Sequence, residues 1–139
     1  MTRARALAAR AEAVVQALLT GDVLALQDLV SPDVIDHSAQ ADQPAGWPGV
    51  RERAMTICAA FPEGDLTVEV LSSEGDVVLA RVEVTAVRRP TALDAPPAAN
   101  RLTAVLVLRL SGGLLTEMWT SADLVLDLPR QQLAPARTG

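Results

Sequence analysis

The segment from Arg109 to Asp123, which reads RLSGGLLTEMWTSAD, decides how the rest of the chain is interpreted. It predicts the end of one strand, a tight turn at Gly112-Gly113 and a second strand, because glycine accepts positive φ without a Cβ clash. Side chains two residues apart share one face of a strand. One face of the second strand would therefore carry Glu117, Trp119, Ser121 and Asp123. Carboxylates on an otherwise apolar strand are either a functional site or ordinary solvated acids.

Length and composition predict one domain spanning residues 1–139, with about 1–5 and 134–139 frayed. Half of the residues are hydrophobic and the formal net charge is −5, so the chain has a real core and no basic patch for nucleic acid. No apolar run approaches the ~20 residues of a membrane span. The amino-terminal residues lack the apolar stretch of a signal peptide, which predicts a cytoplasmic protein.

Several residue types are missing from the sequence, and each absence excludes a class of chemistry. There is no Lys and no Tyr, which excludes a lysine Schiff base and a phenolic proton donor. A single His and a single Cys exclude multi-histidine and cysteine-based metal sites, so no metal and no cofactor is expected. Acid–base chemistry falls to Asp, Glu and His37, and Cys58 is expected to be a buried structural thiol.

The order of predicted elements defines the fold class. Helical periodicity covers residues 3–19, a shorter stretch at 23–30 and residues 48–61, and residues 34–37 look extended. Strand patterns follow at residues 66–71, 77–87, 101–110 and 114–123, with a proline-rich loop at 88–100. Two to three helices followed by long antiparallel strands predict an α+β fold, in which a strongly curled sheet forms a cone around the helices.

The strand at residues 102–110 is apolar on both faces, where a sheet with one solvated face would alternate. The helices cover one face, and a second copy of the chain is the simplest cover for the other. We therefore expect a homodimer that packs through the outer sheet face; the alternative is a very hydrophobic strand at the centre of a monomer's sheet.

A series of short motifs has a recognisable order and spacing along nearly the whole chain. In order they are Val34-Ile35-Asp36-His37, Trp47-Pro48-Gly49, Ala60-Phe61-Pro62, Glu74-Gly75-Asp76-Val77-Val78 with Ala80-Arg81, and Gly112-Gly113-Leu114 with Glu117-Met118-Trp119 and Asp123. This series resembles the SnoaL-like polyketide cyclases, which have the cone fold of nuclear transport factor 2 and ketosteroid isomerase.

The resemblance implies site residues. It implies that Asp123, four residues after the hairpin Trp, is the general acid–base inside the cone, with His37 assisting it. Two family histidines are replaced, one by Met118 and one by Arg88, which departs from the standard aldol-cyclase pattern. The expected substrate-binding side chains are Trp119, Trp47, Glu117, Arg88 and Phe61.

The physical argument for Asp123 is that burial in an apolar cavity would raise the pKa of its carboxyl towards neutrality. It could then remove a proton next to a carbonyl, while a cavity of Leu, Val, Ala and Met folds an aliphatic or polyene chain. The sequence thus predicts a cofactor-independent cyclase acting on a polyketide or related intermediate. Two alternatives stay open: an epoxide-opening hydrolase or isomerase with Glu117, Glu83 or Asp36 as second acid, and a non-catalytic small-molecule-binding protein.

Overall fold

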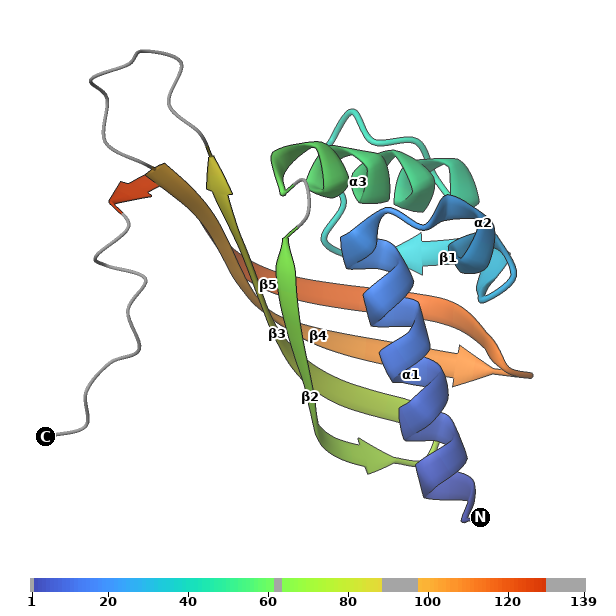
Figure 1. Ribbon diagram of the computed structural model, residues 1–139. Helices are drawn as coiled ribbons and strands as arrows, with labels where there is room; N and C mark the ends of the chain where they lie inside the picture. The colour runs from blue at the N-terminus through green and yellow to red at the C-terminus, as the bar shows by residue number, and fades with distance from the viewer. Residues whose placement is uncertain (1, 62–63, 89–97, 130–139) are drawn as a thin grey trace, which may run out of the picture.

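The computed structural model describes residues 2–61, 64–88 and 98–129, although the side chains of residues 87, 88, 98 and 124–129 are outside the described set. Three helices lie on one face of a five-stranded sheet (Figure 1). The helices are α1 (Arg3–Thr20), α2 (Val23–Gln27) and α3 (Trp47–Ala60), and the strands are β1 (Val30–Asp36), β2 (Asp65–Glu74), β3 (Val77–Arg88), β4 (Ala98–Ser111) and β5 (Leu114–Pro129).

The sheet has the strand order β1-β5-β4-β3-β2, so β4 is its central strand. Strands β2 to β5 are antiparallel, whereas β1 runs parallel to β5 at the edge, which makes the sheet mixed. Pro32 is tolerated in β1 because an edge strand needs hydrogen bonds on one side only. The predicted α+β class is confirmed, and the α1 helix packs against both β2 and α3.

The core lies between the helices and the inner face of the sheet. Alternate residues of β3, β4 and β5 point inward and are buried, with Val78, Leu108 and Met118 completely shielded from solvent. From α1 the buried apolar side chains are Ala11, Val14, Val15, Ala17, Leu18 and Leu19. The intervening residues of β4 point to the opposite, outer face, where Val105 is 38 % exposed.

Two expectations need correction. The strongly curled cone is wrong: the sheet is open, with β1 and β2 as its two separate edges, and it is not strongly curled. The second helix ends at Gln27 rather than near Val30, which already belongs to β1. The α1 helix begins at Arg3, and the hydroxyl of Thr2 caps it by accepting from the Arg5 amide; the expected fraying of residues 1–5 stays a prediction. The expected frayed tail at 134–139 lies outside the described residues.

The loop before α3 is held against that helix by close backbone packing. A Cβ on Gly49 would lie 1.9 Å from the carbonyl oxygen of Pro44, and one on Gly46 would lie 2.7 Å from that of Pro32. No real side chain fits at these distances, so glycine at both positions lets the loop cross over the start of α3. This crossing places residues 38–46 beside the helix that carries Arg53.

Gly49→Ala should therefore lower the free energy of unfolding by about 2–3 kcal/mol, since the Pro44 backbone would have to move. Gly75→Ala is the matched control: Gly75 has φ of 62° but nothing lies within 4 Å of an added Cβ, so only the left-handed backbone costs energy, about 1 kcal/mol. Chemical denaturation followed by circular dichroism measures both. A Gly49→Ala loss no larger than that of Gly75→Ala would contradict the packing.

Candidate functional site

A cavity of about 340 Å³ lies between the inner face of the sheet, helices α1 and α3, and the loop that precedes α3. Its apolar wall is formed by Leu18, Leu19, Ile57, Leu102, Ala104, Leu106 and Ala122. Its polar wall is formed by Ser38, Gln40, Asp42, Gln43, Glu52, Arg53, Thr56 and Thr120. An apolar cavity with convergent polar groups at one side is the usual form of a small-molecule site.

A nearly buried carboxylate organises the polar side of this cavity. The Asp36 side chain is 5 % exposed, and its Oδ2 accepts a 2.7 Å hydrogen bond from Nη1 of Arg53 and a 3.1 Å bond from Nε2 of Gln43. Its Oδ1 accepts from the backbone amide of Ser38 at 3.0 Å. A buried carboxylate is stable only when its oxygens are paired in this way, and here the pairing fixes the Arg53 guanidinium in the cavity wall.

The local sequence explains why Asp36 is in this position. Asp36 is the last residue of β1 and lies opposite Met118 of β5, so the side chain before it, Ile35, points to the other face and is 52 % exposed. The chain then turns into the loop, and Pro48 lies in the first turn of α3, where its missing amide hydrogen costs nothing. Arg53 follows in the middle of α3 and faces back to Asp36.

Thr120 contributes a second feature to the same wall. Its backbone amide donates to Oγ of Ser38 at 2.8 Å, which connects β5 to the residue that binds Asp36. Its hydroxyl oxygen is shielded from solvent and has no hydrogen-bond partner within the described part of the chain. An unpaired buried hydroxyl costs about 1–3 kcal/mol. Because this oxygen has almost no accessible surface, Thr120 lines the cavity through its other atoms.

A separate polar cluster lies on the outer face of the sheet. The His37 ring stacks on Trp119 with centroids 4.4 Å apart and planes 5° from parallel, and its Nε2 lies 2.9 Å from Oε2 of Glu117. Arg109 donates to the other carboxylate oxygen of Glu117 at 3.0 Å and lies 3.8 Å from Asp76. The hydrogen bond from His37 lowers the pKa of Glu117 below its ordinary value, and Arg109 acts in the same direction.

The expected position of Asp123 is wrong. The register pairs Asp123 with Thr103, Trp119 with Val107 and Glu117 with Arg109, so the predicted shared face exists. It is the outer face, because the alternating residues Met118, Thr120 and Ala122 point to the helices. Asp123 is exposed and does not line the cavity. Alternation along β5 therefore separates the predicted acid from the apolar cavity, and its catalytic role remains a prediction without structural support.

The other predicted site residues are also divided between locations. His37 and Glu117 lie in the outer cluster, where His37 contacts Trp119 and Glu117 rather than the cavity. Phe61 is buried in the core at 4 % exposure, and Trp47 is half-buried and packs against that core. The side chain of Arg88 lies outside the described residues.

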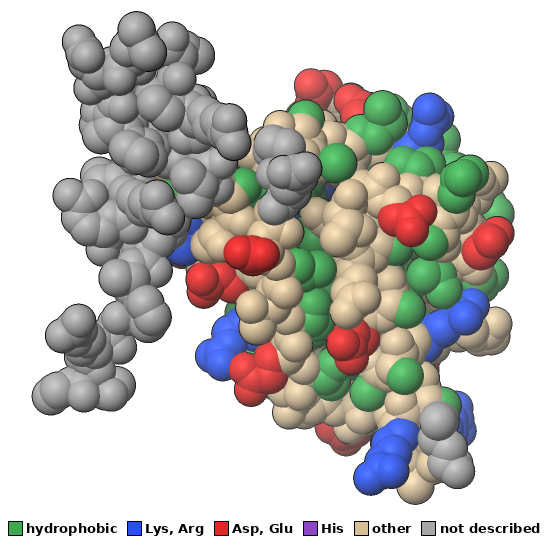
Figure 2. All heavy atoms as spheres, viewed as in Figure 1, with side chains coloured by type: hydrophobic (Ala, Val, Ile, Leu, Met, Phe, Trp, Pro, Cys, Tyr) green, Lys and Arg blue, Asp and Glu red, His purple; other side chains and the backbone are tan. Residues whose placement is uncertain are grey.

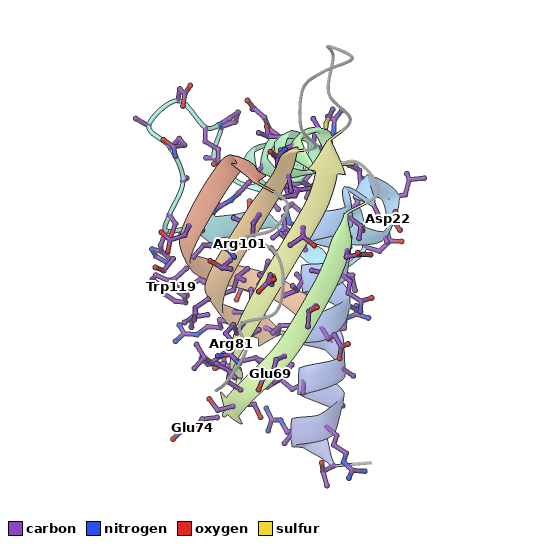
Figure 3. All side chains as sticks on the ribbon, turned by 60° about the vertical axis from the view of Figure 1, so that its left-hand side comes forward. Asp22, Glu69, Glu74, Arg81, Arg101 and Trp119 are labelled. Carbon is purple, nitrogen blue, oxygen red and sulfur yellow. The ribbon has the colours of Figure 1, made fainter. Side chains whose placement is uncertain are left out.

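Three further side chains have defined positions. Arg81 pairs with Glu69 of β2 at 2.6 Å, because Glu69 is its direct cross-strand neighbour (Figure 3). Met118, which replaces a family histidine, is completely buried beneath the helices. Cys58 is half-buried rather than fully buried.

Sequence reasoning did not single out Arg53, Ser38, Gln43 and Thr120, which line the cavity. It suggests Asp36 only as a second acid for an alternative reaction. Arg53 falls on an ordinary amphipathic helix, and nothing in its neighbourhood distinguishes it from the solvated Arg51. One feature of the sequence could have indicated the pair: Asp36 ends a strand only 17 positions before the helical Arg53, and the intervening loop brings the two side chains together.

Within the described ranges, no three or more His, Cys, Asp or Glu side chains are grouped so as to hold a metal ion. No described helix is long and apolar enough to cross a membrane. On the face in Figure 2, acidic and basic side chains are scattered among apolar ones rather than gathered into a patch of one sign.

The fold is that of a small α+β protein with a cavity between its helices and its sheet. A family model described as SnoaL-like polyketide cyclase matches residues 8–131, and the chain belongs to this family. None of the curated proteins compared with the chain matches it.

Solved structures support the same fold. A candidate polyketide cyclase from Bacillus cereus has 24 % identity and a TM-score of 0.68, with 82 % of this chain and 72 % of that chain covered. IdmH, a candidate polyketide cyclase from Streptomyces antibioticus, has 24 % identity and a TM-score of 0.67 over 84 % and 91 % of the two chains. AclR, a candidate hydroxylase from Streptomyces galilaeus, has 24 % identity and a TM-score of 0.62 over 86 % and 90 %. At this identity they define the fold and leave the activity open.

The outer cluster predicts an acid-sensitive contribution to stability. Because the pKa of Glu117 is lowered on folding, its contribution is present above the ordinary carboxyl value of 4.5 and is lost as pH falls through the folded value. Glu117→Gln should therefore flatten the decline in unfolding free energy below pH 4.5, and His37→Gln, which removes the main cause, should do the same. Urea denaturation between pH 3 and 7, with roughly one-unit steps, measures this. An unchanged acid slope in both variants would contradict the pairing.

Proposed function

We propose that this protein is a cofactor-independent cyclase that folds a polyketide-type chain in the cavity beneath α1 and α3. The observation that carries the proposal is the cavity of about 340 Å³, whose sheet side is mainly apolar, with Leu102, Ala104 and Leu106, and whose polar lining includes Arg53 of α3. Membership of the SnoaL-like family supports it. Burial of an aliphatic chain supplies about 0.8 kcal/mol per methylene without fixing a direction, and the polar wall sets the orientation.

The proposed reaction is an intramolecular carbon–carbon bond formation. A carboxylate removes a proton from carbon next to one carbonyl, the resulting enolate carbon attacks a second carbonyl of the same chain, and the new alkoxide takes up a proton. The product then has the mass of the substrate, or one water less if dehydration follows. Holding the two reacting carbons together can supply about 7–11 kcal/mol of the barrier at best, so modest acid–base help is enough.

Asp42 and Glu52 are the carboxylates that line the cavity, and we assign proton transfer to one of them. Asp36 is unsuited because both of its oxygens are occupied by Arg53, Gln43 and Ser38. Asp123 is unsuited because it is exposed on the other face of β5. A base must come within hydrogen-bond reach of the proton it removes, which selects residues of the cavity wall.

A binding protein without turnover is the second candidate. The observation that favours it is that Asp42 and Glu52 are both exposed, so the cavity wall within the described residues has no dry carboxylate. An epoxide-opening hydrolase or isomerase in the same cavity would need two cooperating acids. Product analysis separates these possibilities, because hydrolysis adds one water to the substrate, whereas a binder returns it unchanged.

Cavity filling provides the direct test of the cyclase. Ala104 lines the cavity and is 6 % exposed, so Ala104→Phe should fill it and reduce cyclisation of a neutral poly-β-keto thioester more than tenfold. Mass spectrometry of ring-closed products measures this. Thr103→Phe, which adds the same bulk to the outer face of β4, is the control and should retain activity. Equal activity in both variants would exclude this cavity as the reaction site.

Single carboxylate substitutions then test the assignment of the acid. Loss of turnover in Asp42→Asn or Glu52→Gln, with full activity in Asp123→Asn, is the expected result. If Asp123→Asn alone abolishes turnover at unchanged stability, the assignment to the cavity wall is wrong. Retention of ligand without products in the unaltered protein, across a panel of poly-β-keto thioesters, would favour the binding protein.

We also propose that the outer sheet face pairs with a second copy of the chain. Its centre is apolar, with Val105 38 % exposed and Val107 beside it, and its margins carry charges of both signs such as the Glu69–Arg81 pair. A surface that carries both charges can complement itself across a two-fold axis. Figure 3 shows this face with Arg81, Glu69, Arg101 and Trp119.

Sedimentation velocity should then give twice the chain mass of 14.6 kDa. Val105→Glu should convert the dimer to a monomer, because it places two like charges at the centre of the contact. A wild-type protein that sediments as a monomer at tens of micromolar, a concentration at which a standard-size interface is occupied, would exclude the proposed dimer.

A further inference from the structure

We propose that the free edge of the Arg53 guanidinium, formed by Nε and Nη2, binds both oxygens of a 1,3-dicarbonyl unit and stabilises that unit as its enolate. The inference rests on the cavity of the proposed function and names the part of the substrate that this wall recognises. It concerns how a ligand is bound and ionised, so it can be tested without turnover.

The first observation is that two nitrogens of Arg53 are accessible and unpaired. Within the described part of the chain, the hydrogen bond of Arg53 runs from Nη1 to Oδ2 of Asp36 at 2.7 Å. The described side-chain nitrogens and oxygens that are shielded from solvent without a partner are Nε of Arg109 and the hydroxyl oxygen of Thr120. Nε and Nη2 of Arg53 are not among them, so both keep accessible surface on a side chain that is 22 % exposed.

The position of Arg53 on α3 directs this surface to the cavity. Arg53 lines the cavity, and it is the one cationic side chain among the described residues that do so. The groove along the other side of α3, lined by Pro48, Arg51, Met55 and their neighbours, does not include Arg53. The free nitrogens therefore face the space that a ligand would occupy.

The second observation is which edge of the guanidinium is free. The N–H of Nε and one N–H of Nη2 are parallel and form a planar fork, whereas Asp36 occupies Nη1. The Asp36 side chain is 5 % exposed, and Gln43 and the Ser38 amide hold its oxygens. The fork is thereby kept in one orientation before any ligand binds.

A planar fork is matched by two oxygens that point in the same direction. The cis enolate of a 1,3-dicarbonyl compound has two such oxygens, which share one negative charge. Hydrogen bonds from a cation to an anion are about twice as strong as bonds between neutral groups. A single ketone can fill only one of the two donors, so the fork favours the dicarbonyl unit.

The charges of the wall decide between this enolate and a ligand that enters as an anion. Asp42 and Glu52 line the same cavity and Asp36 lies behind the arginine, so carboxylates outnumber the guanidinium. A free carboxylic acid would bring a further negative charge, which is disfavoured at short range. A 1,3-dicarbonyl compound enters uncharged. When its central C–H bond breaks, the proton passes to Asp42 or Glu52, the electron pair is shared by the two oxygens, and the net charge of the cavity is unchanged.

The same assignment accounts for the exposed carboxylates of the wall. Asp42 and Glu52 are exposed, so burial does not strengthen either as a base. A proton between two carbonyls is more acidic than a proton beside one, and hydrogen bonds to the charged form favour ionisation further. Arg53 thus lets an ordinary carboxylate remove the proton.

The test uses decane-2,4-dione as the probe on the purified full chain, with decan-2-one and decanoate as ligands that offer one ketone or a permanent charge. Titration gives the three dissociation constants, and ultraviolet difference spectroscopy at neutral pH gives the enolate fraction of the bound dione. The dione should bind about tenfold more tightly than either other ligand, and its enolate fraction should be about tenfold higher on the protein than in buffer, the effect of a hydrogen bond to a charged group. This comparison needs no variant.

Arg53→Lys keeps a positive charge beside Asp36 and removes the planar fork. It should bind the dione about tenfold more weakly and lose the added enolate. The matched control is Arg51→Lys, the same substitution at an exposed position of α3 that does not line the cavity. It should leave both measurements unchanged within about twofold, and circular dichroism checks that both variants are folded.

Equal binding of the dione and decan-2-one by the wild type, tighter binding of decanoate, or an enolate fraction that Arg53→Lys leaves unchanged would overturn the proposal. These results are distinguishable from failure of the cyclase. If Ala104→Phe abolishes cyclisation while Arg53→Lys binds the dione as the wild type does, the cyclase stands and the dicarbonyl site does not. Conversely, Arg53-dependent enolate binding without turnover supports the site and contradicts the cyclase.

Discussion

The arrangement of the cavity depends on one buried carboxylate. Asp36 ends the edge strand β1, and its oxygens are shared among Arg53 of α3, Gln43 of the loop and the Ser38 amide. Removing one partner of such a pair costs about 3–5 kcal/mol because it leaves a charge buried alone. The ion pair thereby holds the loop, the helix and the sheet in one geometry, and this geometry is the polar wall of the cavity.

Because side chains alternate along β5, its polar residues are divided between the two faces of the sheet. Thr120 and Met118 point to the helices, whereas Glu117, Trp119 and Asp123 point away from them. The inner side faces the helices and is largely apolar, and the Thr120 hydroxyl there is buried without a partner among the described residues. The outer side contains a stacked His37–Trp119 pair and a chain of charges reaching Arg109 and Asp76, partly open to water. The polar side chains of the outer face are therefore partly solvated, whereas those of the inner face lie beneath the helices.

A cavity with an apolar sheet side suits the proposed reaction, in which shape is the main contribution. Leu102, Ala104 and Leu106 form that side, and the polar lining residues of α3 and the preceding loop include Arg53 and Gln43. Such a site orients a flexible chain by one end and leaves the rest to fold by exclusion of water. The same construction serves a binding protein, which is why the difference between binding and turnover depends on the carboxylates at the rim.

The amino-acid sequence by itself determined the class of fold, the turn at Gly112-Gly113 and the shared strand face of Glu117, Trp119 and Asp123, because these follow from local periodicity and glycine conformation. It could not determine which of the two strand faces lies under the helices, since a strand that is apolar on both sides fits either orientation. Only the tertiary structure decided that Asp123 is outside and Thr120 inside. It also decided that Asp36, Gln43 and Arg53 meet, because a contact between residues 17 positions apart is made by the path of the loop and by packing at Gly49, which no local pattern encodes.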